Sequence, residues 1–156
     1  ALGFSVRGFA RSERHIQGVE MFAGADHLAA FADGLDIVVS VLPLTPDTTG
    51  IINADFLARM SAGAFVINGG RGPQIVDDDL LVALDSGHIG GAALDVFAVE
   101  PLPQDHRYWT HPSVRVWPHV AAQTNADTAA DQVAAAIISI MDGQVPANMV
   151  DWSRGY

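Results

Sequence analysis

Three residues of this 156-residue chain have reactive side chains and stand just after short apolar, strand-like runs. Arg71 stands in the motif Asn-Gly-Gly-Arg-Gly, Glu100 in Val-Glu-Pro-Leu-Pro, and His119 in Pro-His-Val-Ala-Ala. The runs that precede them are residues 65–67, 92–94 and 114–117. Because the carboxyl ends of parallel strands share one edge of a sheet, where open α/β sheets bind their ligands, we expect the three side chains to converge on one cleft.

These side chains together suit chemistry on a small carbonyl acid. The planar, permanently charged fork of Arg71 can bind a carboxylate and polarise the carbonyl beside it. His119 can give a proton to the carbonyl oxygen, and a carboxylate such as Glu100 beside the imidazole stabilises the protonated ring. Each residue also has a structural interpretation, since Arg71 could pair with nearby aspartates and a lone loop histidine is more often a hydrogen-bond partner. Gly70 and Gly72 are expected to let a ligand approach the backbone.

Alternating strand-like and helix-like segments must position these residues. Strands are expected over residues 4–9, 36–42, 64–67, 91–94 and 114–117, and helices over residues 25–33, 54–60, 77–86 and 125–141. The run 36–42 is continuous and apolar, which predicts a strand buried on both faces. The cluster Asp77, Asp78 and Asp79 is interpreted as a helix start. This alternation predicts an α/β fold with a Rossmann-like, doubly wound parallel sheet.

A dinucleotide-binding domain opens with a strand, the loop G-x-G-x-x-G and a helix, and this sequence has no such loop. Residues 1–3 read instead as the end of that first helix. We interpret residues 1–143 as a partial Rossmann domain that lacks the first strand and the glycine-rich loop, and residues 144–156 as a C-terminal tail. With the substrate-binding domain also absent, we expect an N-terminally truncated piece that is inactive alone.

The composition argues against several partners. The eight basic residues are all arginines and face eighteen acids, which gives a net charge of -10 at pH 7 and a surface that repels nucleic acids and anionic membranes. No apolar run approaches the roughly 18 residues that span a bilayer. The absence of cysteine fits a cytoplasmic protein. The remaining histidines lack the spacing of a metal site, so no metal is expected. They are interpreted as surface or loop residues: His15, His27, His88, His106 and His111.

The three motifs, in this order and at this spacing, resemble the catalytic set of the D-2-hydroxyacid dehydrogenases, and the similarity runs over essentially the whole chain. The resemblance implies hydride transfer between a nicotinamide cofactor and a small 2-oxo or 2-hydroxy acid. It assigns Arg71 to the substrate, His119 to acid/base catalysis and Glu100 to holding His119. Within the family, residues 100–103, 108–112 and 150–156 look most like the NADPH-dependent glyoxylate/hydroxypyruvate reductases, and a homodimeric parent enzyme is expected.

The resemblance also implies a set of cofactor-binding residues. Asp95 is expected to contact the nicotinamide carboxamide, although a buried acid there could instead brace its loop. Residues 42–50 resemble the family's loop along the cofactor, in which Pro43 ends the strand and Thr48 offers a hydroxyl. Further cofactor contacts are expected at Leu42, Gly69, Ala121 and Ala122.

Residues at the end of the first strand decide between the two nicotinamide cofactors. Proteins that bind NAD place an acid there for the ribose 2′-hydroxyl. This chain has Ala10 followed by Arg11 and Ser12, and then Arg14, so that two guanidiniums and a hydroxyl could hold a 2′-phosphate. The sequence therefore favours NADP(H), with NAD as the alternative. The structural alternative is that Arg11, Ser12 and Arg14 form an exposed basic loop with no role in cofactor binding.

Two other functions stay open. A family member with another substrate would be a phosphoglycerate, formate or phosphite dehydrogenase, and the missing substrate domain would decide between them. A non-catalytic, dinucleotide-sensing interaction module would keep the fold without turnover, since the family also resembles transcriptional corepressors that retain this fold. A substrate panel and an assay for nucleotide-dependent partner binding would distinguish these functions from 2-oxo acid reduction.

Overall fold

The computed structural model describes residues 3–122 and 124–150, in which strands and helices alternate along the chain. The strands are β1 (Val6–Ala10), β2 (Val19–Ala23), β3 (Ile37–Ser40), β4 (Ala64–Asn68), β5 (Ile89–Leu94) and β6 (Val114–Val116). All strand pairs are parallel, and they form a two-stranded sheet, β1-β2, and a four-stranded sheet in the order β3-β4-β5-β6. The predicted parallel α/β sheet is therefore confirmed.

The helices follow from local signals in the sequence. They are α1 (Leu28–Ala32), α2 (Ala54–Arg59), α3 (Asp77–Asp85) and α4 (Ala126–Met141), with 3-10 turns η1 (Ala25–His27), η2 (Gly72–Gln74) and η3 (Arg107–Trp109). Asn53 caps α2, because its side-chain oxygen accepts the N–H of Phe56. The three aspartates do begin α3, and Asp79 also accepts the N–H of Ala54 at 2.8 Å, which ties the starts of α2 and α3 together.

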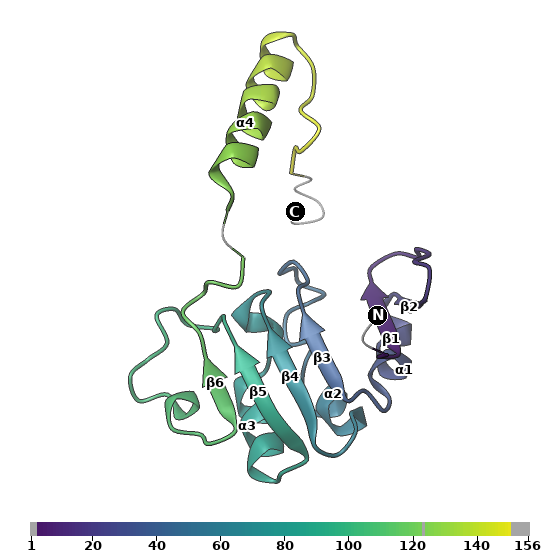
Figure 1. The fold of residues 1–156 in the computed structure, drawn as a ribbon, viewed down its shortest axis with the longest axis vertical. Coiled ribbons are helices and arrows are strands. Elements are labelled where there is room, and N and C mark those ends of the chain that lie inside the picture. The colour runs from purple at the N-terminus through teal and green to yellow at the C-terminus, as the bar shows by residue number, and fades with distance from the viewer. Residues whose placement is uncertain (1–2, 123, 151–156) are drawn as a thin grey trace.

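The hydrophobic core lies on one face of the larger sheet. Alternate residues of β4 point to opposite faces, so that Val66 is fully buried with Leu57 of α2 and Leu80 of α3. On the other face, Phe65 remains 51% exposed and Val39 of β3 remains 56% exposed. The prediction that residues 36–42 are buried on both faces is therefore wrong. Helices α2 and α3 lie on the same side of the sheet, and no described element covers the opposite face (Figure 1).

The two sheets are separated at a slot between β1 and β3. Each of these strands has one edge without a strand partner among residues 3–122 and 124–150. Residues 7–9 and 38–42 line a pocket of about 230 Å³ between them, together with Leu28, Phe31 and Phe56. In a Rossmann sheet of order 3-2-1-4-5-6, this is the place of the first strand. The slot thus matches the predicted fold, which lacks that strand.

The sequence did not predict β2, which is short and carries Glu20 in the middle of its apolar residues. It pairs with β1 in register from Val6 and Val19 onward. The predicted helix over residues 25–33 is found as η1 followed by α1. The other predicted elements have the predicted type, with ends that differ by a few residues.

The last helix stands apart from the sheet. Figure 1 shows α4 extending away from the ends of the strands, and none of its residues is buried. In the described part of the predicted tail, residues 144–150, the chain forms neither helix nor strand, whereas residues 151–156 lie outside the described residues, as do residues 1–2. Within the described ranges, no helix has the length and apolar character needed to cross a membrane.

Candidate active site

The centre of the candidate site is a hydrogen bond between two loops at the carboxyl ends of neighbouring strands. Glu100 lies in the loop after β5 and His119 in the loop after β6, and His119 Nδ1 is 2.9 Å from Glu100 Oε2. The other carboxylate oxygen, Oε1, accepts the backbone N–H of Phe97 at 2.9 Å, which holds the glutamate in its own loop. The two side chains are 37% and 49% exposed, so a ligand can reach them. The predicted contact between Glu100 and His119 is therefore present.

The surroundings of Glu100 favour its charged form. The hydrogen bond with His119 and that from the Phe97 N–H lower the pKa of the Glu100 carboxyl below its ordinary value of 4.5, against a smaller opposing effect of burial. The positive charge of Arg71 acts in the same direction. Glu100 is consequently a carboxylate at neutral pH, as an acid that stabilises a protonated imidazole must be.

Arg71 is held by the residues that follow β4. Asn68, the last residue of β4, is almost fully buried, and its amide donates to the Arg71 carbonyl at 3.0 Å while its oxygen accepts the N–H of Gly70. The guanidinium Nη1 donates to the Gly70 carbonyl at 2.7 Å. No ion pair of Arg71 with an aspartate occurs among the described residues. The fixed backbone thus presents the guanidinium on the same sheet edge as Glu100.

The glycines beside Arg71 make room for other atoms of the protein. A Cβ at Gly72 would lie 1.8 Å from the carbonyl carbon of Phe97, and a Cβ at Gly70 would lie 2.6 Å from the side-chain oxygen of Gln74. The expectation that both glycines also let a ligand approach the backbone stays a prediction. Close packing of the chain on itself requires them.

Asp95 braces the loop that carries His119. Its two carboxylate oxygens accept the backbone N–H groups of Val120 and Ala121, at 2.9 and 2.8 Å. The bracing interpretation of Asp95 thus describes its contacts in this structure, and its contact with a nicotinamide stays a prediction. Ala121 also lies beside Gly69, where a Cβ would be 3.5 Å from the Ala121 Cβ. The predicted cofactor residues Gly69, Ala121 and Ala122 therefore belong to two adjoining loops at this edge.

The predicted cofactor loop after β3 is held by its own hydrogen bonds. The hydroxyl of Thr48 donates to the Pro43 carbonyl at 2.7 Å and accepts the N–H of Thr45 at 2.8 Å. This hydroxyl therefore shapes the loop, and its predicted role toward a cofactor remains a prediction. Leu42 and Pro43 present their carbonyls to the side chain of Gln74, a residue for which the sequence predicted no role.

Residues 11–14, which we call the ribose loop, follow β1 directly. Arg11, Ser12 and Arg14 are all exposed, and the structure brings them together at the carboxyl end of the smaller sheet. The predicted site residues therefore lie in loops after β1, β3, β4, β5 and β6, which is the distribution expected for an elongated dinucleotide.

A pocket of about 680 Å³ lies beside the Glu100–His119 pair. Its lining is mostly apolar and comes from the loops after β5 and β6: Phe97, Pro101, Leu102, Trp109, Trp117 and Pro118. Arg71 does not line it. Glu100 and His119 themselves also line it, so a ligand in this pocket would meet both side chains.

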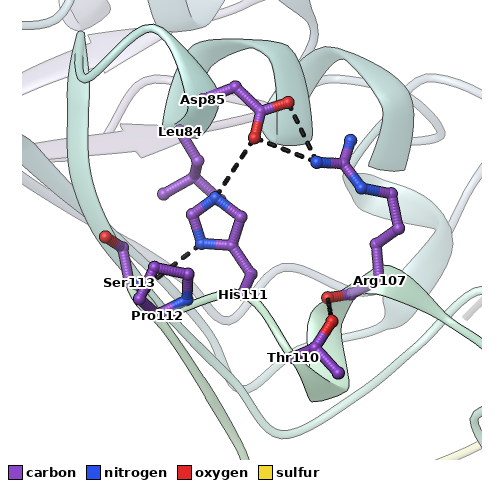
Figure 2. A pocket seen from close by; sticks show the side chains of 7 residues that line it. All are labelled: Leu84, Asp85, Arg107, Thr110, His111, Pro112 and Ser113. Atoms are coloured by element: carbon purple, nitrogen blue, oxygen red, sulfur yellow. Dashed lines mark hydrogen bonds and ion pairs between the residues drawn. The ribbon is translucent and has the colours of Figure 1, made fainter.

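A second pocket contains none of the predicted site residues. Figure 2 shows Asp85 of α3 between Arg107 and His111, with Arg107 Nη2 at 3.0 and 3.1 Å from the two carboxylate oxygens and His111 Nε2 at 3.4 Å from one of them. The His111 side chain is only 8% exposed, and its Nδ1 accepts the N–H of Ser113. His111 lies in a loop, as one of the two predicted environments requires, but its side chain packs against Asp85 of α3 and not at the surface.

The sequence also missed three polar residues that support the site. Ser40, Asn68 and Gln74 are buried and hydrogen-bonded at the ends of β3 and β4 and in η2. Asn68 ends the apolar run that forms β4, and a polar residue at that position is the signal that could have found it. Ser40 is the one polar residue between Ile37 and Leu42, which is a weaker signal. Gln74 had no such signal, since its partners Ser40, Leu42 and Pro43 are distant in sequence.

A parallel sheet that presents an arginine and a glutamate–histidine pair at its carboxyl edge has the architecture of a dinucleotide-binding oxidoreductase domain. Residues 1–121 match the family model described as the D-isomer specific 2-hydroxyacid dehydrogenase, NAD binding domain. The chain belongs to this family.

Named relatives extend the match to the rest of the chain. The chain is 49% identical over 156 residues to the glyoxylate/hydroxypyruvate reductase A of Serratia proteamaculans (strain 568), covering 100% of this chain and 50% of that protein. It is 44% identical over 154 residues to the protein of the same name from Yersinia enterocolitica, covering 99% and 49%. The chain thus spans about half the length of the curated relatives it matches.

Solved structures agree with this assignment. A D-isomer specific 2-hydroxyacid dehydrogenase from Xanthobacter autotrophicus Py2, in complex with NADPH and MES, has a TM-score of 0.95 at 45% identity, covering 99% of this chain and 64% of that one. The NADPH-dependent glyoxylate/hydroxypyruvate reductase from Sinorhizobium meliloti, in complex with NADP and sulfate, has a TM-score of 0.91 at 43% identity, covering 99% and 50%. The fold prediction is confirmed by both.

Proposed function

We propose that the polypeptide that contains this chain is an NADP(H)-dependent reductase of small 2-oxo acids, with glyoxylate and hydroxypyruvate as substrates. We call this polypeptide the full-length protein. The observation that carries the proposal is the 2.9 Å contact between His119 Nδ1 and Glu100 Oε2, next to Arg71 on one sheet edge. The relatives named for this activity support the substrate class.

Three residues of the chain have separate roles toward the substrate. The Arg71 guanidinium binds the carboxylate of the 2-oxo acid and polarises its C2 carbonyl. His119 holds its ring through Nδ1 on Glu100, so that Nε2 gives a proton to the C2 oxygen and takes it back in the reverse reaction. Glu100 stabilises the protonated ring before transfer. A nicotinamide cofactor, when bound, would supply the hydride for this reduction.

The residues present fit a dinucleotide with a 2′-phosphate. The exposed residues Arg11, Ser12 and Arg14 follow β1, and the one acid of this loop, Glu13, comes three residues after the strand ends at Ala10. At the other end, Gly69 lacks a side chain beside Ala121, so that a flat ring system can lie against backbone there. We propose that the ribose loop holds the 2′-phosphate, with Leu42, Pro43, Thr48, Gly69, Asp95, Ala121 and Ala122 along the rest of the cofactor. The NADPH and NADP complexes of similar proteins support this choice.

We further propose that the full-length protein is a cytoplasmic homodimer that acts on small molecules. The net charge of -10 and the absence of a membrane-spanning helix in the described residues are consistent with such a protein. Light scattering of the purified protein would test the dimer, since a monomer at micromolar concentration would contradict it.

The function is tested by following NADPH oxidation by the full-length protein with a panel of 2-oxo acids. Glyoxylate and hydroxypyruvate are expected to give the highest kcat/KM, and 3-phosphohydroxypyruvate a much lower one. Formate and phosphite are offered with NADP+ in the oxidative direction. Turnover with formate, phosphite or the phosphorylated acid alone would point to another activity of the family, and no turnover with any of them would contradict the proposal.

A further inference from the structure

Gln74 connects two loops that the proposed reaction must keep in a fixed relation. It is the last residue of η2, and its side chain is completely buried, with 0% exposure. The side-chain oxygen accepts the hydroxyl of Ser40 at 2.8 Å and the backbone N–H of Arg71 at 3.1 Å. The side-chain nitrogen donates to the carbonyl of Leu42 at 2.7 Å and to that of Pro43 at 3.3 Å. One amide thus bonds to the loops after β3 and β4.

The shape of the backbone is adapted to this amide. A Cβ at Gly70 would lie 2.6 Å from the Gln74 oxygen and 3.1 Å from the Leu42 carbonyl oxygen, so a larger residue at Gly70 would displace the amide. Every hydrogen-bonding group of the Gln74 side chain has a partner, and those partners lie up to 34 positions away in sequence. The site needs a donor and an acceptor on one short planar group. A purely apolar residue would remove the side-chain partners of the part-buried Arg71 N–H and Leu42 carbonyl.

We propose that Gln74 is a positioning residue that sets the Arg71 guanidinium and the Leu42–Pro43 backbone in one arrangement, so that the substrate and cofactor ends of the site are fixed together. This proposal rests on the proposed function, which assigns Arg71 to the substrate and residues 42–43 to the cofactor. Gln74 itself touches neither ligand. Its effect is therefore transmitted to both ligands through backbone atoms.

Two substitutions separate this role from simple core packing. Gln74→Leu keeps the approximate volume and removes both hydrogen-bonding ends. Gln74→Glu keeps the acceptor for Ser40 and Arg71 but places a carboxylate oxygen against the Leu42 carbonyl, until protonation restores a donor there. Tyr108→Phe is the matched control, because it removes one hydrogen bond of a buried side chain, that from the Tyr108 hydroxyl to Asp77, away from both loops.

The readouts are the melting temperature and the dissociation constants of NADPH and of oxalate, a non-reacting dicarboxylate, for the full-length protein. For Gln74→Leu, we expect both ligands to bind at least about tenfold more weakly at a temperature where the variant is folded. For Gln74→Glu, we expect near-normal oxalate binding and weakened NADPH binding that returns toward the wild-type value as the pH falls. Tyr108→Phe is expected to lower the melting temperature and to leave both constants unchanged.

Some outcomes would overturn the proposal. Variants of Gln74 that melt earlier but bind both ligands like the wild type would make Gln74 a packing residue only. The proposal would also be contradicted if Gln74→Glu bound NADPH as tightly as the wild type at every pH. Wild-type protein that binds both ligands but reduces no 2-oxo acid would remove the proposed function, and the binding data would still decide the role of Gln74. If Gln74→Leu does not fold, Gln74→Glu alone decides.

Discussion

His119 is held by Glu100 through Nδ1, and among residues 3–122 and 124–150 its other ring nitrogen, Nε2, has no recorded hydrogen-bond partner. The ring is therefore oriented by a carboxylate on one side and open to a ligand on the other. This asymmetry is what proton transfer to a bound substrate requires.

Removal of this ring should abolish most of the turnover. We expect His119→Gln in the full-length protein to lower kcat by about 10² to 10⁴ with little change in NADPH affinity, because one proton-transfer group is lost. The control is His88→Gln. His88 stands just before β5, at the opposite edge of the sheet, and contacts the carbonyl of Leu57 in α2. Near-normal turnover of His119→Gln would contradict the acid/base role.

The charge of Glu100 should support catalysis by His119. We expect Glu100→Gln to lower kcat by about tenfold or more with little change in NADPH affinity, because a hydrogen bond to a neutral amide holds His119 Nδ1 less firmly than one to a carboxylate. Steady-state rates of the two proteins test this, and an unchanged kcat would contradict the pairing.

The same carboxylate links stability to pH. Since the folded protein lowers the pKa of Glu100 below 4.5, its contribution to stability is present above that value and is lost as the pH falls through the lowered pKa. Glu100→Gln should therefore lose less stability on acidification than the wild type in denaturant titrations, although the exposure of Glu100 keeps this difference small.

Loss of the Arg71 guanidinium should affect the substrate more than the cofactor. We expect Arg71→Ala to raise the KM for glyoxylate by roughly ten- to a hundredfold, as one or more charge-assisted hydrogen bonds are lost. Arg71→Lys is the control that keeps the charge without the fork, and it should recover part of the loss. An unchanged KM would place the substrate carboxylate elsewhere.

The ribose loop should determine the choice of cofactor. We expect the double variant Arg11→Ala and Arg14→Ala to raise the KM for NADPH at least tenfold more than that for NADH, since hydrogen bonds to charged groups contribute roughly 1.5 to 3 kcal/mol each. Added salt should weaken NADPH binding selectively. Arg115→Ala is a control for the loss of an arginine away from the ribose loop, because Arg115 lies in β6 and contacts the carbonyls of Pro112 and Val114. Equal use of both cofactors by the wild type would contradict the assignment.

An added methyl group should cost much more stability at one glycine of the loop after β4 than at another. Gly72→Ala forces a Cβ onto the Phe97 backbone and is expected to destabilise the fold by about 3 kcal/mol or more. Gly69→Ala meets only an ordinary contact with Ala121 and should change the free energy of unfolding by less than about 1 kcal/mol. Denaturant titrations of both variants test this, and equal losses would contradict the packing at Phe97.

The sequence predicted the features that depend on nearby residues. Apolar runs and caps located most of the elements, and the position of Glu100 and His119 after successive strands predicted their contact. The open face of β3 was not predictable in this way, because Val39 is exposed only where no described helix covers the sheet. The contacts of Gln74 with Leu42 and of His111 with Asp85 were not predicted for the same reason, since each joins residues far apart in sequence. Tertiary contacts, which local patterns do not encode, decide such positions.

The slot between β1 and β3 places the two ends of the proposed cofactor site on separately hydrogen-bonded sheets. Within the described ranges, side chains and not strand pairing join the smaller sheet to the larger: the Phe31 ring lies 5.4 Å from that of Phe9 in β1 and 6.3 Å from that of Phe56 in α2. A full-length protein that places the first strand of the order 3-2-1-4-5-6 in this slot would hydrogen-bond β1 and β3 into one continuous sheet. That strand would fix the distance between the ribose loop and His119 before a dinucleotide binds, so the span of the cofactor site would be set by backbone pairing.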